Sequence, residues 1–281
     1  MKLSIVTINY NNAEGLRKTL ASVAAQTYRD IEHIIIDGGS TDGSVDAIKE
    51  YVTANPNRDP FFKHTKYWVS ERDNGIYNAM NKGIKKASGA YIQILNSGDI
   101  YAAPDVVSRM VTEIEKAEYP ELLYGNMIKK DYATEKIIEI TGQEEYSLRL
   151  FYSSTLNHDC CYFRRDMFDT YGLYDESLKI VSDWKWFLQA IGLGQVKPVY
   201  VDIDVTIFDA SGISESNLEL RNKERRQVVE EVLPPAVLAD YDAHAFEMEQ
   251  MKRLRKHHLY GLVYFIERVL FKLEKWSFLR R

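Results

Sequence analysis

Acidic residues stand where short apolar runs end in the first hundred residues of this chain. Asp37 closes the run IEHIIID, and Glu71 and Asp73 come at the end of TKYWVSE. Asp99 follows the apolar run YIQIL after the short break NSG. Carboxylates can hold a cation, accept a proton or fix a turn. The elements that position these acids therefore decide which chemistry is open to them.

The apolar runs alternate with amphipathic segments. Leu16, Leu20 and Val23 recur at helical spacing after the first run. The predicted strands are 3–8, 31–37, 65–71 and 90–95, and the predicted helices are 13–26, 45–54 and 78–87. Strands separated by single helices predict an α/β fold with a mostly parallel sheet. Ligands bind beyond the carboxyl ends of the strands in such a sheet, so we expect the acids to gather along one rim.

This rim lacks the signatures of two common nucleotide sites. A dinucleotide-binding fold carries G-x-G-x-x-G after its first strand, whereas the turn here is NYNN, without glycine. Gly38, Gly39 and Gly43 follow the second predicted strand and have a different spacing. No G-x-x-x-x-G-K-[ST] loop is present in the sequence. The sequence therefore argues against a nicotinamide-dependent enzyme and against a P-loop enzyme.

Composition sets the class of protein. The 281 residues, 45% of them hydrophobic and 27% charged, can form one large core, or one core with an appendage. The net charge of −5 shows no excess of basic residues, so we expect no nucleic-acid partner. Cys160 and Cys161 are adjacent, which suits neither a disulfide nor a zinc site. With no leader-like start and no run of about 18 apolar residues, these features favour a cytoplasmic location.

Three stretches, in order, carry a family resemblance. They are SIVTINYNNAEGLRKTLASVAAQTYRDIEHIIIDGGSTDGSVDAI, SERDNGIYNAMNKGIKKASGAYIQILNSGDIY and LNHDCCYFRRDMFDTYGLYDESLKIVSDWKWFLQA. Over about residues 3–215 the chain resembles the family 2 glycosyltransferases, nearest to the bacterial branch that builds capsule, exopolysaccharide or lipopolysaccharide. The resemblance implies a three-layer GT-A-like domain at 1–215 and a helical C-terminal extension at 216–281.

The resemblance also implies a metal site. Transfer from a nucleoside-diphosphate sugar releases a diphosphate, and Mg²⁺ or Mn²⁺ held by carboxylate commonly stabilises its charge. The D-x-D-type cluster of the family is reduced to NSGD here, so Asp99 resembles its one remaining metal ligand. The alternative is that Asp99 caps the following helix, which Pro104 and Asp105 open.

Residues on the first two strand ends match positions at the nucleoside. Asp37 resembles an acid that meets uracil, although relatives often have a second acid where this chain has Gly38. Asn9 and Tyr10 match the Y-N turn of the family and are predicted to line the nucleoside. The alternatives are that Asp37 holds the GG turn through an Asx-type bond and that the NYNN segment is a simple turn.

Two further residues match positions near the nucleotide, in the segment ERDNGIYNAMNKGI. Asp73 and Lys82 are predicted to bind the donor there, with Lys82 opposing phosphate charge. The alternative for Lys82 is a solvated helix face that it shares with Lys85 and Lys86. His158, in LNHDCC, borders the donor sugar or the acceptor in this interpretation, or is a structural histidine.

The predicted catalytic base is Asp183. If the sugar is transferred with inversion, the acceptor hydroxyl attacks directly and a carboxylate must take its proton. Asp183 in IVSDWKWFLQA matches the candidate of the family, with Ser182 where relatives often carry a second acid. A helix N-terminus favours the ionised form of such an acid. The alternative is that Asp183 only stabilises the first helical turn.

The last third of the chain is charged and helical. Its tail sets an apolar stripe that includes Leu259, Ile266 and Leu273 beside many Lys and Arg side chains. Such a helix fits docking on the catalytic domain, a homodimer, or peripheral contact with the inner face of the cytoplasmic membrane. The sequence leaves these three open.

Together these inferences predict a metal-dependent inverting glycosyltransferase. Its donor is a nucleotide sugar, UDP-linked, and its acceptor is a hydroxyl of a glycan or lipid-linked glycan. One alternative is a non-catalytic relative that binds nucleotide sugars or glycans, since the metal cluster is reduced. The other is a nucleotidyltransferase, which would normally show a glycine-rich basic loop after the first strand.

Overall fold

The computed structural model describes residues 1–53, 65–131, 136–142, 147–209 and 217–256, together with 261, 264–266, 268 and 270. Its strands are β1 (Leu3–Asn9), β2 (Ile31–Asp37), β3 (Thr65–Ser70), β4 (Tyr91–Ile94), β5 (Ile100–Tyr101), β6 (Leu122–Asp131), β7 (Lys136–Thr141), β8 (Cys161–Arg164) and β9 (Val199–Asp209). Its α-helices are α1 (Ala13–Ala24), α2 (Ser44–Thr53), α3 (Ile76–Lys86), α4 (Val106–Lys116), α5 (Leu150–Ser153), α6 (Met167–Tyr171), α7 (Ser182–Phe187), α9 (Leu218–Val232) and α10 (Pro235–Lys256). A 3₁₀ turn at His158–Cys160 precedes β8, and a π-helical turn at Leu188–Gly192 follows α7.

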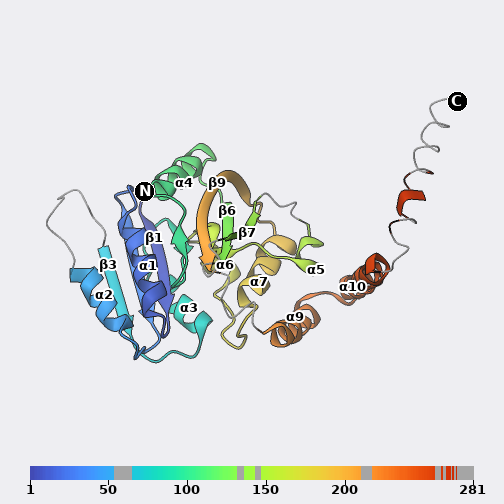
Figure 1. Cartoon of the computed structure of the whole chain (residues 1–281), viewed down its shortest axis with the longest axis horizontal. Helices are drawn as coiled ribbons and strands as arrows, with labels where there is room; N and C mark the ends of the chain where they lie inside the picture. The colour runs from blue at the N-terminus through green and yellow to red at the C-terminus, as the bar shows by residue number, and fades with distance from the viewer. Residues whose placement is uncertain are drawn as a thin grey trace. The chain divides into compact units, whose positions relative to one another are not determined.

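The described strands form one sheet in the order β3-β2-β1-β4-β8-β6-β9-β5, with β7 paired to β6 (Figure 1). The pairs β3–β2, β2–β1, β1–β4 and β6–β9 are parallel, and β8 is antiparallel to both β4 and β6. Strands β5 and β7 are antiparallel to their neighbours. Six strands therefore run in one direction, and their carboxyl ends define one rim of the sheet.

Helices cover both faces of the parallel part of the sheet. Ile35 of β2 packs with Leu16 of α1 and Ile48 of α2 on one face. On the other face, a side chain at Gly83 of α3 would place its Cβ only 2.2 Å from Cγ1 of Val6 in β1. Glycine therefore lets α3 lie directly on β1. The result is a helix–sheet–helix sandwich around a core of aliphatic side chains.

The predicted α/β class and the four early strands are confirmed. The later half of the sheet was not predicted, because β5, β6, β8 and β9 pair across distant parts of the chain. No hairpin turn or repeated spacing marks these pairings in the sequence. The antiparallel strand β8 joins the two halves by contacting β4 on one side and β6 on the other.

The chain divides into two compact units, Met1–Val228 and Val229–Arg281. The sequence-based boundary near residue 215 stays a prediction, as do the three alternatives for the C-terminal helix. In the second unit, α10 has no buried residue, and Phe246, Met251 and Leu254 are exposed. Most of the predicted apolar stripe, including Leu259 and Leu273, lies outside the described residues. Among the helices that are described, none is long and apolar enough to span a membrane.

The contact of α3 with β1 gives a test of the fold. We predict that Gly83→Ala lowers the free energy of unfolding by about 1–3 kcal/mol, because its new methyl group meets Val6. Adding Val6→Ala removes the opposing Cγ atoms and should recover part of that loss, as urea unfolding would show. Additive effects of the two substitutions would contradict this packing.

Candidate active site

Asp37 lies at the carboxyl end of β2, directly beside Asn9 at the end of β1. It is fully buried, and its two oxygens accept five hydrogen bonds, from Asn9, Gly39, Ser40 (two) and Ser70. Burial raises the pKa of Asp37, but the hydroxyls of Ser40 and Ser70 and the amide of Asn9 outweigh it and hold the pKa below its usual value. The ionised Asp37 thus forms the Asx-type turn that follows β2.

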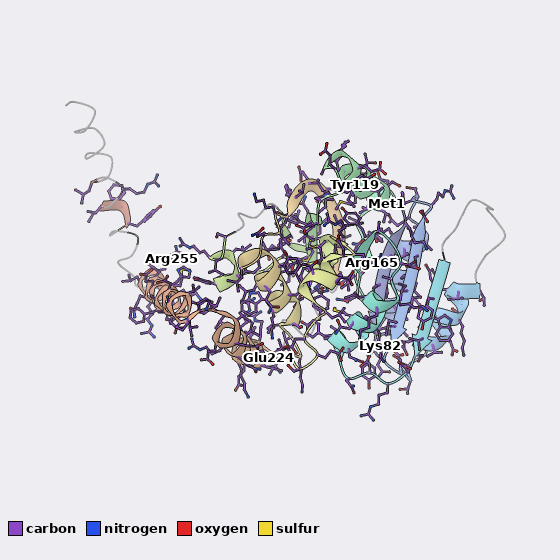
Figure 2. All side chains as sticks on the ribbon, turned by 180° about the vertical axis from the view of Figure 1, so that it is seen from behind. Met1, Lys82, Tyr119, Arg165, Glu224 and Arg255 are labelled. Carbon is purple, nitrogen blue, oxygen red and sulfur yellow. The ribbon has the colours of Figure 1, made fainter. Side chains whose placement is uncertain are left out.

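Tyr10 and Asp73 both approach Gly38, where an added Cβ would meet their side chains. The Tyr10 side chain is 66% exposed, and Asp73 lies in the loop between β3 and α3. Oδ1 of Asp73 accepts a hydrogen bond from the backbone N–H of Gly75 at 3.0 Å. Lys82 of α3, labelled in Figure 2, pairs with Glu71 at 2.7 Å. The structure therefore brings the predicted nucleotide residues Asn9, Tyr10, Asp37 and Asp73 to one corner of the rim, with Lys82 held by an acid of the neighbouring loop.

Asp99 follows β4 in a tight turn that α1 holds in place. The Thr19 hydroxyl donates to the Asp99 carbonyl at 2.8 Å and accepts from the Gly98 N–H at 2.9 Å. Asp99 leads into β5, and the N-cap position of α4 belongs to Asp105. The helix-cap alternative for Asp99 is therefore wrong. The residue is 4% exposed.

The donor set in this turn is sparse but suits a metal that binds phosphate. Within the described ranges, no three His, Cys, Asp or Glu side chains are arranged to hold a metal ion. Asn96 Oδ1, in the same turn as Asp99, is buried without a hydrogen-bond partner in the part of the chain that is described. One carboxylate and one amide oxygen fit Mg²⁺ or Mn²⁺, which keep water and phosphate oxygens as their other ligands.

Asp183, the predicted base, is the second residue of α7. Its Oδ1 lies 2.9 Å from the Tyr77 hydroxyl, and its Oδ2 lies 3.0 Å from Nδ1 of His158. The Asp183 side chain is 18% exposed and that of His158 is 17% exposed, so both still reach solvent. On its other side, Nε2 of His158 lies 3.0 Å from Nδ2 of Asn96. His158 therefore links the NSGD turn to the candidate base.

The two groups shift each other's pKa in opposite directions. Burial raises the pKa of Asp183, but the hydrogen bond and charge of His158, with the Tyr77 hydroxyl, bring it below its ordinary value. Burial lowers the pKa of His158, but the hydrogen bond and charge of Asp183 outweigh it and raise that pKa. The ionised carboxylate only accepts hydrogen bonds, so Nδ1 of His158 carries a proton. Asp183 is thus held ionised and oriented.

Hydrogen bonds with Glu224 and Tyr77 fix the loop that leads to Asp183. Glu224 of α9, labelled in Figure 2, accepts the backbone N–H groups of Lys179 and Ile180 at 2.8 and 2.9 Å. The Ile180 carbonyl lies 2.7 Å from the Tyr77 hydroxyl, which also faces Asp183. The sequence did not single out Tyr77 or Glu224. Tyr77 lies inside the quoted DNGIYNAMNKG motif, which is the only signal that could have found it.

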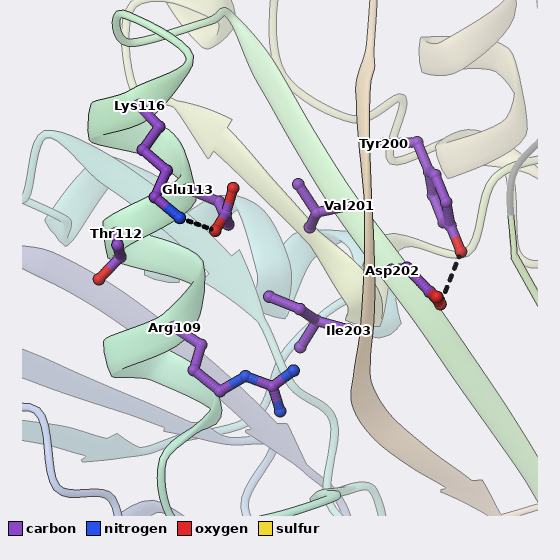
Figure 3. A pocket seen from close by; sticks show the side chains of 8 residues that line it. All are labelled: Arg109, Thr112, Glu113, Lys116, Tyr200, Val201, Asp202 and Ile203. Carbon is purple, nitrogen blue, oxygen red and sulfur yellow. Dashed lines mark hydrogen bonds and ion pairs between the residues drawn. The ribbon is translucent and has the colours of Figure 1, made fainter.

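A separate surface hollow of about 580 Å³ lies between α4 and β9 and contains none of these residues (Figure 3). Two of its charged groups, Lys116 and Glu113, pair with each other, and Tyr200 donates to Asp202. These contacts satisfy groups on the walls of the hollow. The rim at Asp99 and Asp183 remains the candidate active site.

Comparison with known sequences agrees with the family resemblance. The profile described as glycosyl transferase family 2 matches residues 4–172. An uncharacterized glycosyltransferase of Mycobacterium tuberculosis is 33% identical over 214 residues, covering 75% of this chain and 76% of that protein. A PGL/p-HBAD biosynthesis glycosyltransferase of Mycobacterium bovis is 26% identical over 210 residues, covering 74% and 77%.

Solved structures with the same fold include S. aureus TarS and a mannosyltransferase. The crystal structure of S. aureus TarS 1–349 in complex with UDP-GlcNAc matches with a TM-score of 0.62 at 17% identity, covering 82% of this chain. This chain spans 64% of that one, less than two thirds of its length. The mannosyltransferase PcManGT from Pyrobaculum calidifontis, in complex with GDP-Man and Mn²⁺, gives 0.62 at 16% identity, covering 87% and 69%. These matches confirm the predicted GT-A-type fold.

The pair of Asp183 and His158 predicts a pH-dependent stability. The pKa of His158 is raised in the folded protein, so its protonated form adds to the free energy of unfolding. This stabilisation is complete below the unfolded pKa of about 6.5 and is lost as pH rises through the folded pKa. The pKa of Asp183 is lowered in the folded protein, so its ionised form adds to the free energy of unfolding. This stabilisation is present above the unfolded pKa of about 3.9 and is lost as pH falls through the folded pKa. We therefore expect His158→Gln to destabilise the protein, by on the order of 1 kcal/mol, more at pH 5.5 than at pH 9.

Urea unfolding at the two pH values measures this difference. Wild-type protein unfolded at the same two pH values serves as the reference. An equal loss of stability at both pH values for His158→Gln would contradict the charged pair.

Proposed function

Since this chain belongs to glycosyl transferase family 2, we propose that it transfers a sugar from a UDP-sugar, with inversion, to a hydroxyl of a glycan or lipid-linked glycan. The observation that carries this proposal is the ionised carboxylate of Asp183, held between Tyr77 and His158 and joined through Asn96 to the turn of Asp99. That arrangement provides a base beside the place where a diphosphate would leave.

The donor assignment draws on the solved structures with the same fold. One of them was crystallised with UDP-GlcNAc, and another with GDP-Man and Mn²⁺. On the rim of this chain, we propose that Tyr10 contacts the nucleobase and that Asp99 binds a divalent metal at the diphosphate. When bound, the metal neutralises charge on the leaving diphosphate, and we propose Mn²⁺ or Mg²⁺ for this role.

The residues of the chain then act on the acceptor. The acceptor oxygen forms a bond to the anomeric carbon as the bond from that carbon to the diphosphate breaks. Asp183 takes the proton of the acceptor hydroxyl, which requires it to be ionised and within hydrogen-bond reach. His158 and Tyr77 hold the two carboxylate oxygens, so the base keeps one orientation.

The proposed acceptor class draws on the name of a relative and on the quoted motifs. A relative at 26% identity carries the name PGL/p-HBAD biosynthesis glycosyltransferase, and the quoted motifs are nearest to branches that build capsule or lipopolysaccharide. We propose an acceptor of cell-surface polysaccharide biosynthesis, used in the cytoplasm at the inner face of the membrane. A non-catalytic binding role is the alternative, and it predicts nucleotide binding without turnover.

The base assignment predicts the behaviour of one substitution. Asp183→Asn keeps the shape of the side chain but cannot accept the proton, so we expect kcat to fall by about 10²–10⁴-fold while UDP binding persists. Turnover of UDP-sugars measures the first quantity, and calorimetry with UDP measures the second. Asp169→Asn, outside the site on α6, is the matched control. Turnover at the wild-type rate in Asp183→Asn would show that Asp183 is not the catalytic base.

The metal assignment predicts a second outcome. Calorimetry should show that Mn²⁺ strengthens UDP binding to the wild type, and that Asp99→Ala abolishes this enhancement without abolishing the fold. The reason is that Asp99 supplies the carboxylate of a sparse donor set. An enhancement that is unchanged in Asp99→Ala would mean that the metal does not bind at Asp99.

A further inference from the structure

One face of α9 carries two arginines beside the loop that leads to Asp183. Arg221, Glu224, Arg225 and Val228 share this face, because they are spaced by three or four residues along the helix. Glu224 and Val228 are buried, and both arginines are partly buried. Since Glu224 holds the loop before Asp183, this face brings two cations close to the candidate base.

The acids around these arginines are already engaged by other groups. Glu224 spends its two oxygens on backbone N–H groups of the loop, one of them that of Lys179. Earlier in the same loop, Asp175 pairs with Lys185 at 2.8 Å. Its neighbour Glu176 accepts hydrogen bonds from two asparagine side chains of α3. The hydrogen bonds of these three carboxylates therefore go to groups other than the two arginines.

Arg221 has a buried donor that the protein does not satisfy. Its Nε is buried and has no hydrogen-bond partner in the part of the chain that is described. Buried polar groups are normally hydrogen-bonded, and a bound ion is one explanation for an exception. Arg225, one turn later, places its guanidinium 4.9 Å from the centre of the Trp184 ring. Like charges four residues apart on a helix repel each other, so an anion beside both would stabilise this face.

The two oxygens of Asp183 lead to different parts of the site. Oδ2 faces His158 and, through it, the NSGD turn, where the diphosphate is proposed to leave. Oδ1 faces Tyr77, which is joined through the loop to Glu224 of α9. In a transfer with inversion the acceptor attacks from the side opposite to the leaving group. The arginines of α9 therefore lie on the side of the base that suits the acceptor.

We propose that Arg221, together with Arg225, binds a phosphate group of the acceptor. The acceptor is then a glycan that is joined to its carrier through phosphate or diphosphate. A guanidinium is planar, stays charged and can donate two parallel hydrogen bonds to phosphate oxygens. This inference rests on the proposed function, because it requires an acceptor hydroxyl at Asp183.

Calorimetry with inorganic phosphate tests the site. The protein is first saturated with UDP and Mg²⁺, so that the donor site is occupied, and ionic strength is held constant. Wild type should bind phosphate, and Arg221→Gln should weaken this binding by about tenfold or more through the loss of a charged hydrogen bond. Arg221→Lys keeps the charge without the planar fork and should show a smaller loss. Lys223→Gln, on the exposed side of α9, is the matched control and should bind phosphate as wild type does.

A pair of sugars tests whether the site takes phosphate that is attached to a sugar. Glucose 1-phosphate and glucose are titrated in the same way. We expect wild type to prefer glucose 1-phosphate, and Arg221→Gln to lose most of this preference. Equal affinity of wild type for the two sugars would contradict a phosphate site for the acceptor.

The outcomes distinguish this inference from the proposed function. UDP affinity equal to that of wild type shows that a variant is folded, and Arg221→Lys decides the question if Arg221→Gln does not fold. Phosphate binding that is unchanged in the folded variants overturns the role of Arg221 and leaves the donor class standing. Phosphate binding that UDP abolishes in wild type would belong to the donor site and also overturns it. Failure of wild type to bind UDP overturns the proposed function, and this inference with it.

Discussion

The hydrogen bond between Asp183 and His158 is the interaction on which the arrangement of the site depends. It joins the 3₁₀ turn before β8 to the start of α7, and through Asn96 it reaches the turn after β4. Burial alone would favour the neutral form of this carboxylate, so the donors around it decide its charge. Glu224 and Tyr77 fix the loop that carries it, which makes part of α9 a support of the site.

The acids of the rim divide into two kinds. Asp37 uses its whole hydrogen-bonding capacity on the turn after β2, so its charge serves the fold. Asp73 and Asp183 have fewer protein donors, and both residues remain partly exposed. Aspartates of one site thus differ in chemistry, because the number of protein donors around each one differs.

Local pattern in the sequence predicted the elements better than their contacts. The four early strands follow from apolar runs separated by amphipathic segments, and the common rim follows from the parallel direction of the strands. The contact of Tyr77 with Asp183 spans 106 residues and depends on how α3 and α7 meet, which no short pattern encodes. The same holds for Asp73 at Gly38, since the space that an absent side chain leaves is visible only in three dimensions.

The hydroxyl of Tyr77 has one proton and two acceptors, the carbonyl of Ile180 and the carboxylate of Asp183. When Asp183 is ionised, the proton can turn toward it, and when Asp183 has been protonated, the same proton can turn to the carbonyl. A rotation about one C–O bond therefore matches the two charge states of the carboxylate without moving the loop. Asp183 can therefore gain and lose a proton without a movement of the surrounding backbone.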